Sequence, residues 1–142
     1  MIIEWNEEIA SGIEEIDRQH KQIISLLNQI IYYFETPDSL KELVSSLLEF
    51  SKVIHEHFDF EEKLLAEYGF KGLKNHKAGH EEISDLINSV IMPAMLDEEG
   101  DIAAEPIINI VRWFENHLRT EDARYFQAIK HTQDQQLTEL LK

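Results

Sequence analysis

The sequence predicts an all-α protein, an antiparallel up-down-up-down four-helix bundle with an N-terminal arm and a short C-terminal helix. Apolar residues recur at alternating steps of three and four, which places them on one face of a helix. Only five Gly and three Pro occur in 142 residues, and the turn-forming residues gather at three places. No window shows the alternation of a strand. We therefore expect four amphipathic helices of about 20 residues in a single domain, 1–142.

Four apolar stripes follow one another along the chain. They run over 16–34, 43–68, 73–94 and 103–117. Each stripe marks the face that a helix turns toward the core, and short connections make successive helices antiparallel. The stripes are separated by three clusters of turn-forming residues, Thr36–Ser39, Tyr68–Gly72 and Asp97–Asp101.

A few residues at these breaks predict how the helices begin and end. Asp38 or Ser39 is placed to cap the start of the second helix. Gly69 is placed just after the end of that helix, where the backbone of a single residue often takes a left-handed conformation. Pro93 is expected to kink or end the third helix, and Pro106 suits the first turn of the fourth.

The two ends of the chain lie outside the four stripes. The arm covers about 1–16, and Trp5 is expected to anchor it on the bundle of about 17–131. A short C-terminal helix is predicted over about 132–142, with apolar residues at helical spacing: Leu137, Leu140 and Leu141.

Composition excludes several classes of protein. Twenty-eight acidic residues against 13 basic ones give a formal charge of −15, which repels phosphate backbones and anionic lipid. There is no apolar run long enough to span a membrane and no signal-like leader, so we expect a cytoplasmic protein without membrane insertion. The absence of Cys excludes disulfides, iron–sulfur clusters and Cys-ligated zinc.

Polar residues interrupt the apolar stripes. A buried imidazole or carboxylate is costly unless it is paired or binds a metal. One such His is most often an ordinary core residue, but five His and one Glu on the inward faces of four helices indicate a metal site. These candidate ligands are His20, His57, Glu61, His76, His80 and His117.

Spacing places these donors next to one another. His76 and His80 are four residues apart, as are His57 and Glu61, so each pair shares a helix face. Asp122 lies five residues after His117, about 140° further round an ideal helix. Asp122 reaches the centre only if the fourth helix is kinked or carries a π-bulge. A donor set of imidazole with carboxylate favours iron over magnesium or calcium, and it leaves one position open on a pair of octahedral ions.

The order of these motifs resembles the hemerythrin family, in particular the bacterial hemerythrins. The motifs are His20, then His57-x-x-x-Glu61, then His76-x-x-x-His80, then His117-x-x-x-x-Asp122, and the likeness extends over about residues 5–131. The resemblance implies two oxo- or hydroxo-bridged iron ions per chain. It assigns His76, His80 and His117 to one iron, His20 and His57 to the other, and Glu61 and Asp122 to both.

The resemblance also implies dioxygen as the ligand, bound at the iron with fewer protein donors. Residues expected to line the dioxygen pocket could equally be ordinary core residues: Ile23, Ile24, Phe58, Trp113, Phe114 and Leu118. His55 and His131 fall off the stripes and are expected on the surface. Asp17 and Gln19 are expected to cap the first helix or to support the ligands, and Glu62 is expected beside the ligands or on the surface.

The predicted function is reversible dioxygen binding for carriage, storage or delivery, without enzymatic activity. Two other functions stay open. A sensor of oxygen, redox state or iron would need a separate signalling partner, and a carrier would serve an oxygen-consuming enzyme. A di-iron oxidase or peroxidase is disfavoured, because ferritin-like sites use Glu-x-x-His and no His here has Glu three residues before it. Zinc could displace iron on affinity grounds, and the oligomeric state is open.

Overall fold

The computed structural model describes residues 3–96, 102–119 and 123–141, and within these ranges it contains helices and no strand. One short 3₁₀ turn, Glu7–Ile9, precedes the main helices. This confirms the predicted all-α class. The five α-helices are α1 (Glu14–Glu35), α2 (Leu40–Glu67), α3 (Leu73–Leu96), α4 (Ala104–His117) and α5 (Ala123–Leu141).

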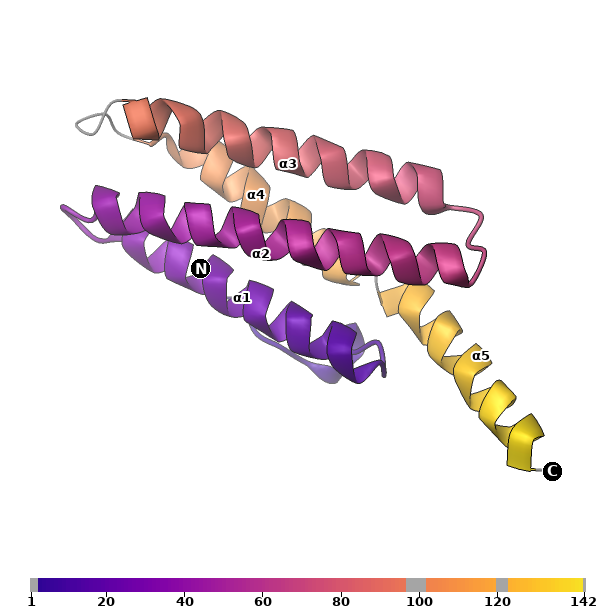
Figure 1. Cartoon of the computed structure of the whole chain (residues 1–142). Helices are drawn as coiled ribbons and strands as arrows, with labels where there is room; N and C mark the ends of the chain where they lie inside the picture. Colours follow the sequence, from indigo (N-terminus) through magenta and orange to yellow (C-terminus); the bar gives the residue numbers. More distant parts are fainter. Residues whose placement is uncertain (1–2, 97–101, 120–122, 142) are drawn as a thin grey trace.

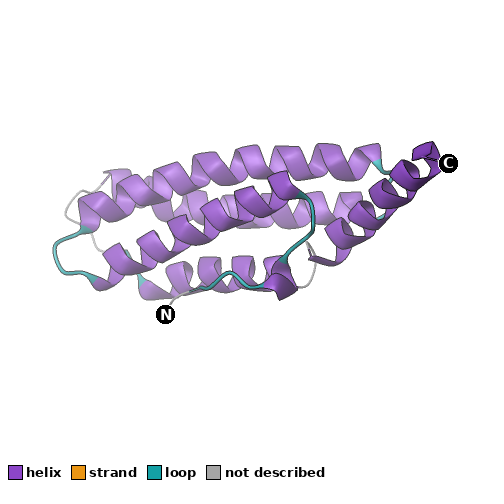
Figure 2. Ribbon diagram, turned by 90° about the horizontal axis from the view of Figure 1, so that it is seen from below, coloured by secondary structure: helices purple, strands orange, loops and turns teal. Residues whose placement is uncertain are grey.

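Helices α1 to α4 form the predicted antiparallel bundle (Figure 1). Each packs against the next, α1 on α2, α2 on α3 and α3 on α4. Helix α5 leaves the end of the bundle at an angle, which both views show (Figures 1 and 2). In the part of the chain that the structure describes, no helix is long and apolar enough to cross a membrane.

The bundle core is built from the apolar stripes. Burying one large apolar side chain stabilises a protein by roughly 1.5–3 kcal/mol. The rings of Phe50 and Phe114 meet edge to face across α2 and α4, with centroids 5.1 Å apart. The fully buried aliphatic residues of this core include Ile23, Leu27, Leu47, Ile54 and Ile87.

A second, smaller cluster closes the end of the bundle from which α5 departs. Ile16 of α1, Leu65 of α2, and Phe126 and Ile129 of α5 bury one another there. The Gln127 amide also donates a hydrogen bond of 3.0 Å to the carbonyl of Ala10 in the arm. The first turns of α5 therefore belong to the core, although the rest of the helix projects away from it.

The end of α2 confirms the prediction for Gly69. Gly69 has φ +64° and follows Tyr68, the residue that caps the end of the helix. Its N–H donates to the Ala66 carbonyl at 3.0 Å, and the Phe70 N–H donates to the Leu65 carbonyl at 3.0 Å. This pair of bonds satisfies two carbonyls at the end of the helix, and Gly supplies the left-handed backbone without strain.

The start of α2 differs from the prediction. Ser39 occupies the cap position, but its side chain makes no capping hydrogen bond to the helix. Its hydroxyl donates instead to the Pro37 carbonyl at 3.3 Å. Asp38 lies one residue too early and takes a left-handed conformation with φ 58°. The turn that precedes the helix therefore uses both polar residues, and α2 begins without a side-chain cap.

The two prolines behave differently. Pro106 lies in the first turn of α4, as predicted, where its missing N–H costs nothing. Pro93 lies inside α3, which continues to Leu96, so it does not end the helix at its own position.

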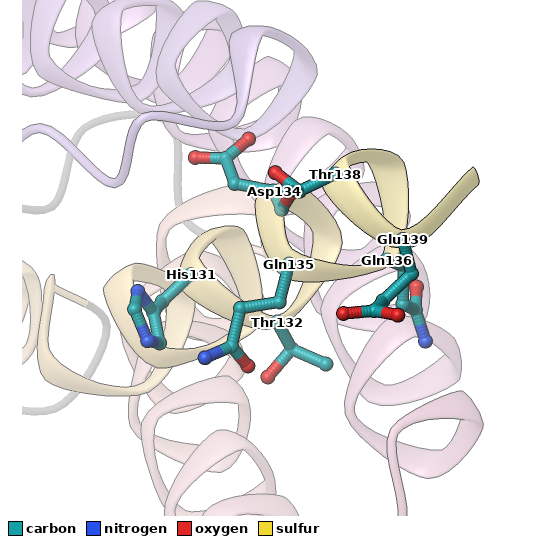
Figure 3. A pocket seen from close by; sticks show the side chains of 7 residues that line it. All are labelled: His131, Thr132, Asp134, Gln135, Gln136, Thr138 and Glu139. Carbon is teal, nitrogen blue, oxygen red and sulfur yellow. The ribbon is translucent and has the colours of Figure 1, made fainter. Parts of the chain in front are cut away.

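The C-terminal helix is longer than predicted. The sequence places its start at about residue 132, whereas α5 begins at Ala123 and runs through that position without a break. No Gly or Pro interrupts residues 123–141, and Phe126 and Ile129 hold the first turns on the bundle. Beyond them, seven polar side chains between His131 and Glu139 radiate from α5 around an open hollow lined by this helix (Figure 3).

The N-terminal arm is fastened to α1 by Asp17. Its carboxylate accepts hydrogen bonds from the Ser11 N–H and the Ser11 hydroxyl, both at 2.8 Å, and from the Gly12 N–H at 3.2 Å. Gly12 takes φ +81° at this turn. Trp5 packs against the core, and the Lys21 ammonium lies 4.8 Å from the centroid of its ring. The expected anchoring role of Trp5 agrees with these contacts.

Replacing Asp17 tests this attachment. We expect Asp17→Ala to lower the free energy of unfolding by about 1–3 kcal/mol, because three donors lose their acceptor. Urea unfolding followed by circular dichroism measures the loss. Glu14→Ala, at an exposed position in the same first turn, is the matched control and should change stability little. Equal stability of the two variants would show that the arm is held by other contacts.

Candidate metal centre

All four bundle helices send a His into one buried cluster. α1 contributes His20, α2 contributes His57, α3 contributes His76 and His80, and α4 contributes His117. Glu61 of α2 lies among them and is fully buried. The structure thus brings together six of the seven predicted ligands, and the exposed fraction of each is 4% or less: His20, His57, Glu61, His76, His80 and His117.

One oxygen of Glu61 faces two imidazoles. Its Oε1 atom lies 3.2 Å from Nε2 of His20 and 2.5 Å from Nε2 of His57. His20 comes from α1, and His57 lies one turn before Glu61 on α2. These three donor atoms lie within 4.8 Å of one another, close enough to surround one ion.

The other oxygen of Glu61 faces three imidazoles. Its Oε2 atom lies 3.0 Å from Nε2 of His76, 3.3 Å from Nε2 of His80 and 3.9 Å from Nε2 of His117. These four donors also lie within 4.8 Å of one another. Glu61 therefore joins a two-His group to a three-His group, the same division that the resemblance assigns. Ligation of a metal by each residue stays a prediction.

The environment keeps Glu61 ionised. Burial raises the pKa of its carboxyl, but this is outweighed by the coulombic attraction of His57 and by the polar nitrogens of His117, His20 and His57 beside its oxygens. The pKa therefore lies well below its ordinary value. A buried carboxylate surrounded by imidazole nitrogens is a donor set suited to a transition metal.

The ring of His57 is oriented by Gln19. Nδ1 of His57 lies 2.6 Å from Oε1 of Gln19. The amide of Gln19 donates through Nε2 to Glu15 at 2.9 Å, so its oxygen is the end that faces His57. Arg18 donates two bonds to Glu15, of 3.1 and 2.6 Å, and its hydrogen bond lowers the pKa of Glu15 to about 2. Gln19 thus has the supporting role that was one of its two predicted roles.

This hydrogen bond has a consequence for the metal. With the proton on Nδ1 donated to Gln19, the other ring nitrogen of His57, Nε2, faces the Glu61 carboxylate. Either a second proton on His57 or a metal ion can join these two groups, and a metal ion binds in place of that proton. His80 is similar, because its buried Nε2 makes no hydrogen bond to any described residue. The residues present therefore fit a bound metal.

Apolar and aromatic side chains surround the donors. Phe58 stacks on the ring of His80, with centroids 3.7 Å apart and planes 6° apart. Trp113 stacks on His117 at 4.4 Å and 18°. Trp113 is partly buried, and the remaining predicted pocket residues are buried: Ile23, Ile24, Phe58, Phe114 and Leu118. Phe58 and Trp113 contact ligand rings, and the role of all six residues as the lining of a dioxygen pocket stays a prediction.

The seventh predicted ligand, Asp122, lies outside the described residues. The chain just before it is irregular, because Leu118 and Arg119 form a π-helical turn after α4. A π-turn here is the distortion that the prediction for Asp122 requires. Its ligation of a metal stays a prediction.

Three further predictions concern residues beside the site. His55 and His131 are exposed, as predicted. Glu62 lies next to the ligands, with Oε2 3.6 Å from Nδ1 of His80. The support of Gln19 by Glu15 was missed, although the four-residue spacing of the two on one helix face was a signal for it.

A four-helix bundle with a buried cluster of five His and one Glu has the donor set of a non-haem metal site. The model for the hemerythrin HHE cation-binding domain matches residues 11–129. The chain belongs to this family.

Named relatives agree with this assignment. The chain is 28% identical to a bacteriohemerythrin of Pseudomonas aeruginosa over 140 residues, 97% of this chain and 86% of that protein. It is 24% identical to a bacteriohemerythrin of Clostridium acetobutylicum over 127 residues, 85% of this chain and 96% of that protein. It is also similar to a mutant protein of known crystal structure, with a TM-score of 0.77 and 21% identity over 88% of this chain and 97% of the other. That last likeness supports the fold.

Removing the Gln19 amide tests its role at His57. We expect Gln19→Leu to weaken metal binding at the two-His group about 10- to 100-fold, the usual cost of losing a partner that orients a ligand. Titration with Co²⁺, followed by its visible absorption, measures the two affinities separately. Gln22→Leu, at an exposed position on the same helix, is the matched control. Unchanged Co²⁺ affinity in Gln19→Leu would contradict the role.

Proposed function

We propose that this protein binds dioxygen reversibly at a non-haem di-iron centre, and that it carries, stores or delivers oxygen without acting as an enzyme. The division of Glu61 between the two-His and three-His groups carries the proposal. One carboxylate with its oxygens turned to different imidazole groups is suited to bridge two ions. The family of the chain supports iron as the metal.

The two groups are unequal, and this inequality supports ligand binding. The group on Oε1 of Glu61 has one imidazole fewer than the group on Oε2. If Asp122 and an oxygen bridge complete both ions alike, the two-His side keeps a free position for an external ligand. When bound there, the iron pair would supply the electrons and the open coordination site that dioxygen needs.

The surroundings of the centre favour reversible binding. Phe58 is buried against the rings of His80 and His117. Ile23 and Phe114 are buried three residues from His20 and His117 along their helices, and Leu118 is buried directly after His117. Apolar side chains exclude the water that would otherwise promote irreversible oxidation of the centre. The described donors comprise five imidazoles and one carboxylate, unlike the carboxylate-rich sites that activate oxygen in ferritin-like proteins.

Iron loading and oxygen exposure test the proposal directly. We expect the reduced protein to bind two irons per chain, and oxygen to produce a visible charge-transfer band that disappears when oxygen is removed. Iron is measured with a chromogenic chelator, and the band by absorption spectroscopy over repeated cycles. Less than one iron per chain, or a band that persists under vacuum, would contradict reversible binding at a di-iron centre.

Two histidines two residues apart provide a matched pair of variants. His57→Ala removes a donor of the two-His group, so we expect it to lose one iron and the oxygen-dependent band while the helices remain. His55→Ala alters an exposed imidazole that hydrogen-bonds the Ser51 carbonyl at 2.6 Å, and it should keep both irons. Iron content, the visible spectrum and circular dichroism compare the two. Full oxygen binding in His57→Ala would refute the assignment of this ligand.

A further inference from the structure

A groove of about 400 Å³ lies on the surface between α2 and α3, next to the metal centre. The two helices run antiparallel, and each contributes residues at successive turns of one face. Two of the lining residues, Phe58 and His80, belong to the centre itself. The other lining residues are polar or charged: His55, Asp59, Glu62, Lys77, Glu81, Ser84, Asp85 and Asn88.

The charge of the groove favours a cation. Glu62, Glu81 and Asp85 contribute carboxylates, and Lys77 is the cation among the lining residues. Asp59 adds a further carboxylate, which pairs at 2.8 Å with the exposed Lys63. A concave surface with an excess of one sign of charge raises the local concentration of the opposite ion. Uncharged dioxygen gains nothing from this field.

His80 connects the groove to the interior. Its Nδ1 atom lies 3.6 Å from Oε2 of Glu62 on the groove side, and its Nε2 atom lies 3.3 Å from Oε2 of Glu61 on the inner side. The side chain of His80 is 4% exposed, and neither ring nitrogen makes a hydrogen bond to a described residue. A buried imidazole with uncommitted nitrogens thus forms the wall between the acidic groove and the predicted metal site.

We propose that this groove is the route by which ferrous iron reaches the centre, and that Glu62 takes the ion from solution and passes it to His80. Glu62 is suited to this task, because its side chain is 24% exposed and touches both the groove and His80. A carboxylate binds a hydrated Fe²⁺ readily, and imidazole then holds it more firmly. The Phe58 ring, stacked on His80, must shift for the ion to pass. The proposal rests on the iron centre proposed above.

Iron uptake by the metal-free protein tests the route. Fe²⁺ is added without oxygen at low ionic strength, and the iron that stays free is measured at timed intervals with a chromogenic chelator. Two variants remove groove charges, Glu62→Gln and the double variant Glu81→Gln/Asp85→Asn. The matched control, Glu49→Gln/Glu82→Gln, removes two exposed carboxylates of α2 and α3 outside the groove.

We expect both groove variants to take up iron about three- to tenfold more slowly than the control, with the same final iron per chain. Raising the ionic strength should shrink the difference, because salt screens the attraction. Equal rates in the groove and control variants would overturn the route. An unchanged rate with a lower final iron content in Glu62→Gln would overturn it too, since Glu62 would then only position His80. Failure of the unaltered protein to bind iron would refute the centre itself.

Discussion

A single buried carboxylate, Glu61, organises the middle of this bundle. Each of α1, α2, α3 and α4 places at least one imidazole against it, at the layer where an ordinary bundle would bury aliphatic side chains. Desolvating a carboxylate and five imidazoles is costly unless their charges and lone pairs are matched. The relative height and rotation of all four helices must therefore bring their imidazoles to Glu61. The apolar core on one side of this layer and the smaller end cluster on the other side hold the helices in that position.

Two residues of α1 that are two positions apart, Asp17 and Gln19, show how the surroundings support this layer. Asp17 turns outward to the arm and accepts three hydrogen bonds from Ser11 and Gly12. Gln19 turns inward, and its amide oxygen accepts a hydrogen bond from Nδ1 of His57. The first turns of α5 cover the same end of the bundle through Phe126 and Ile129. The arm, the first helix and the last helix thus close the end of the bundle next to the centre.

Much of the fold and the candidate site could be predicted from the sequence, because both follow from helical spacing. Apolar steps of three and four identify the four helices, and His or Glu at the same steps must share the buried face. Features that depend on tertiary context were harder to predict from the sequence. The start of α5 at Ala123 has no Gly or Pro to mark it, and the backbone at Leu118 departs from a regular helix. The missing side-chain cap at Ser39 depends on the turn before it, which residue preferences do not determine.

The two imidazole groups differ in what lies behind them, and this asymmetry bears on how metal is held and gained. Behind His57 stands a chain of hydrogen bonds, through Gln19 to Glu15, in which Nδ1 of His57 is already occupied. Behind His80 stands Glu62, a partly exposed carboxylate at 3.6 Å with room beside it. A His whose second ring nitrogen is held by a hydrogen bond favours retention of a bound metal. A His whose second ring nitrogen lies beside a solvent-accessible carboxylate favours exchange of the metal. In the proposed centre, retention of the metal and access to it would therefore depend on different sides of Glu61, so that a change on one side need not alter the other.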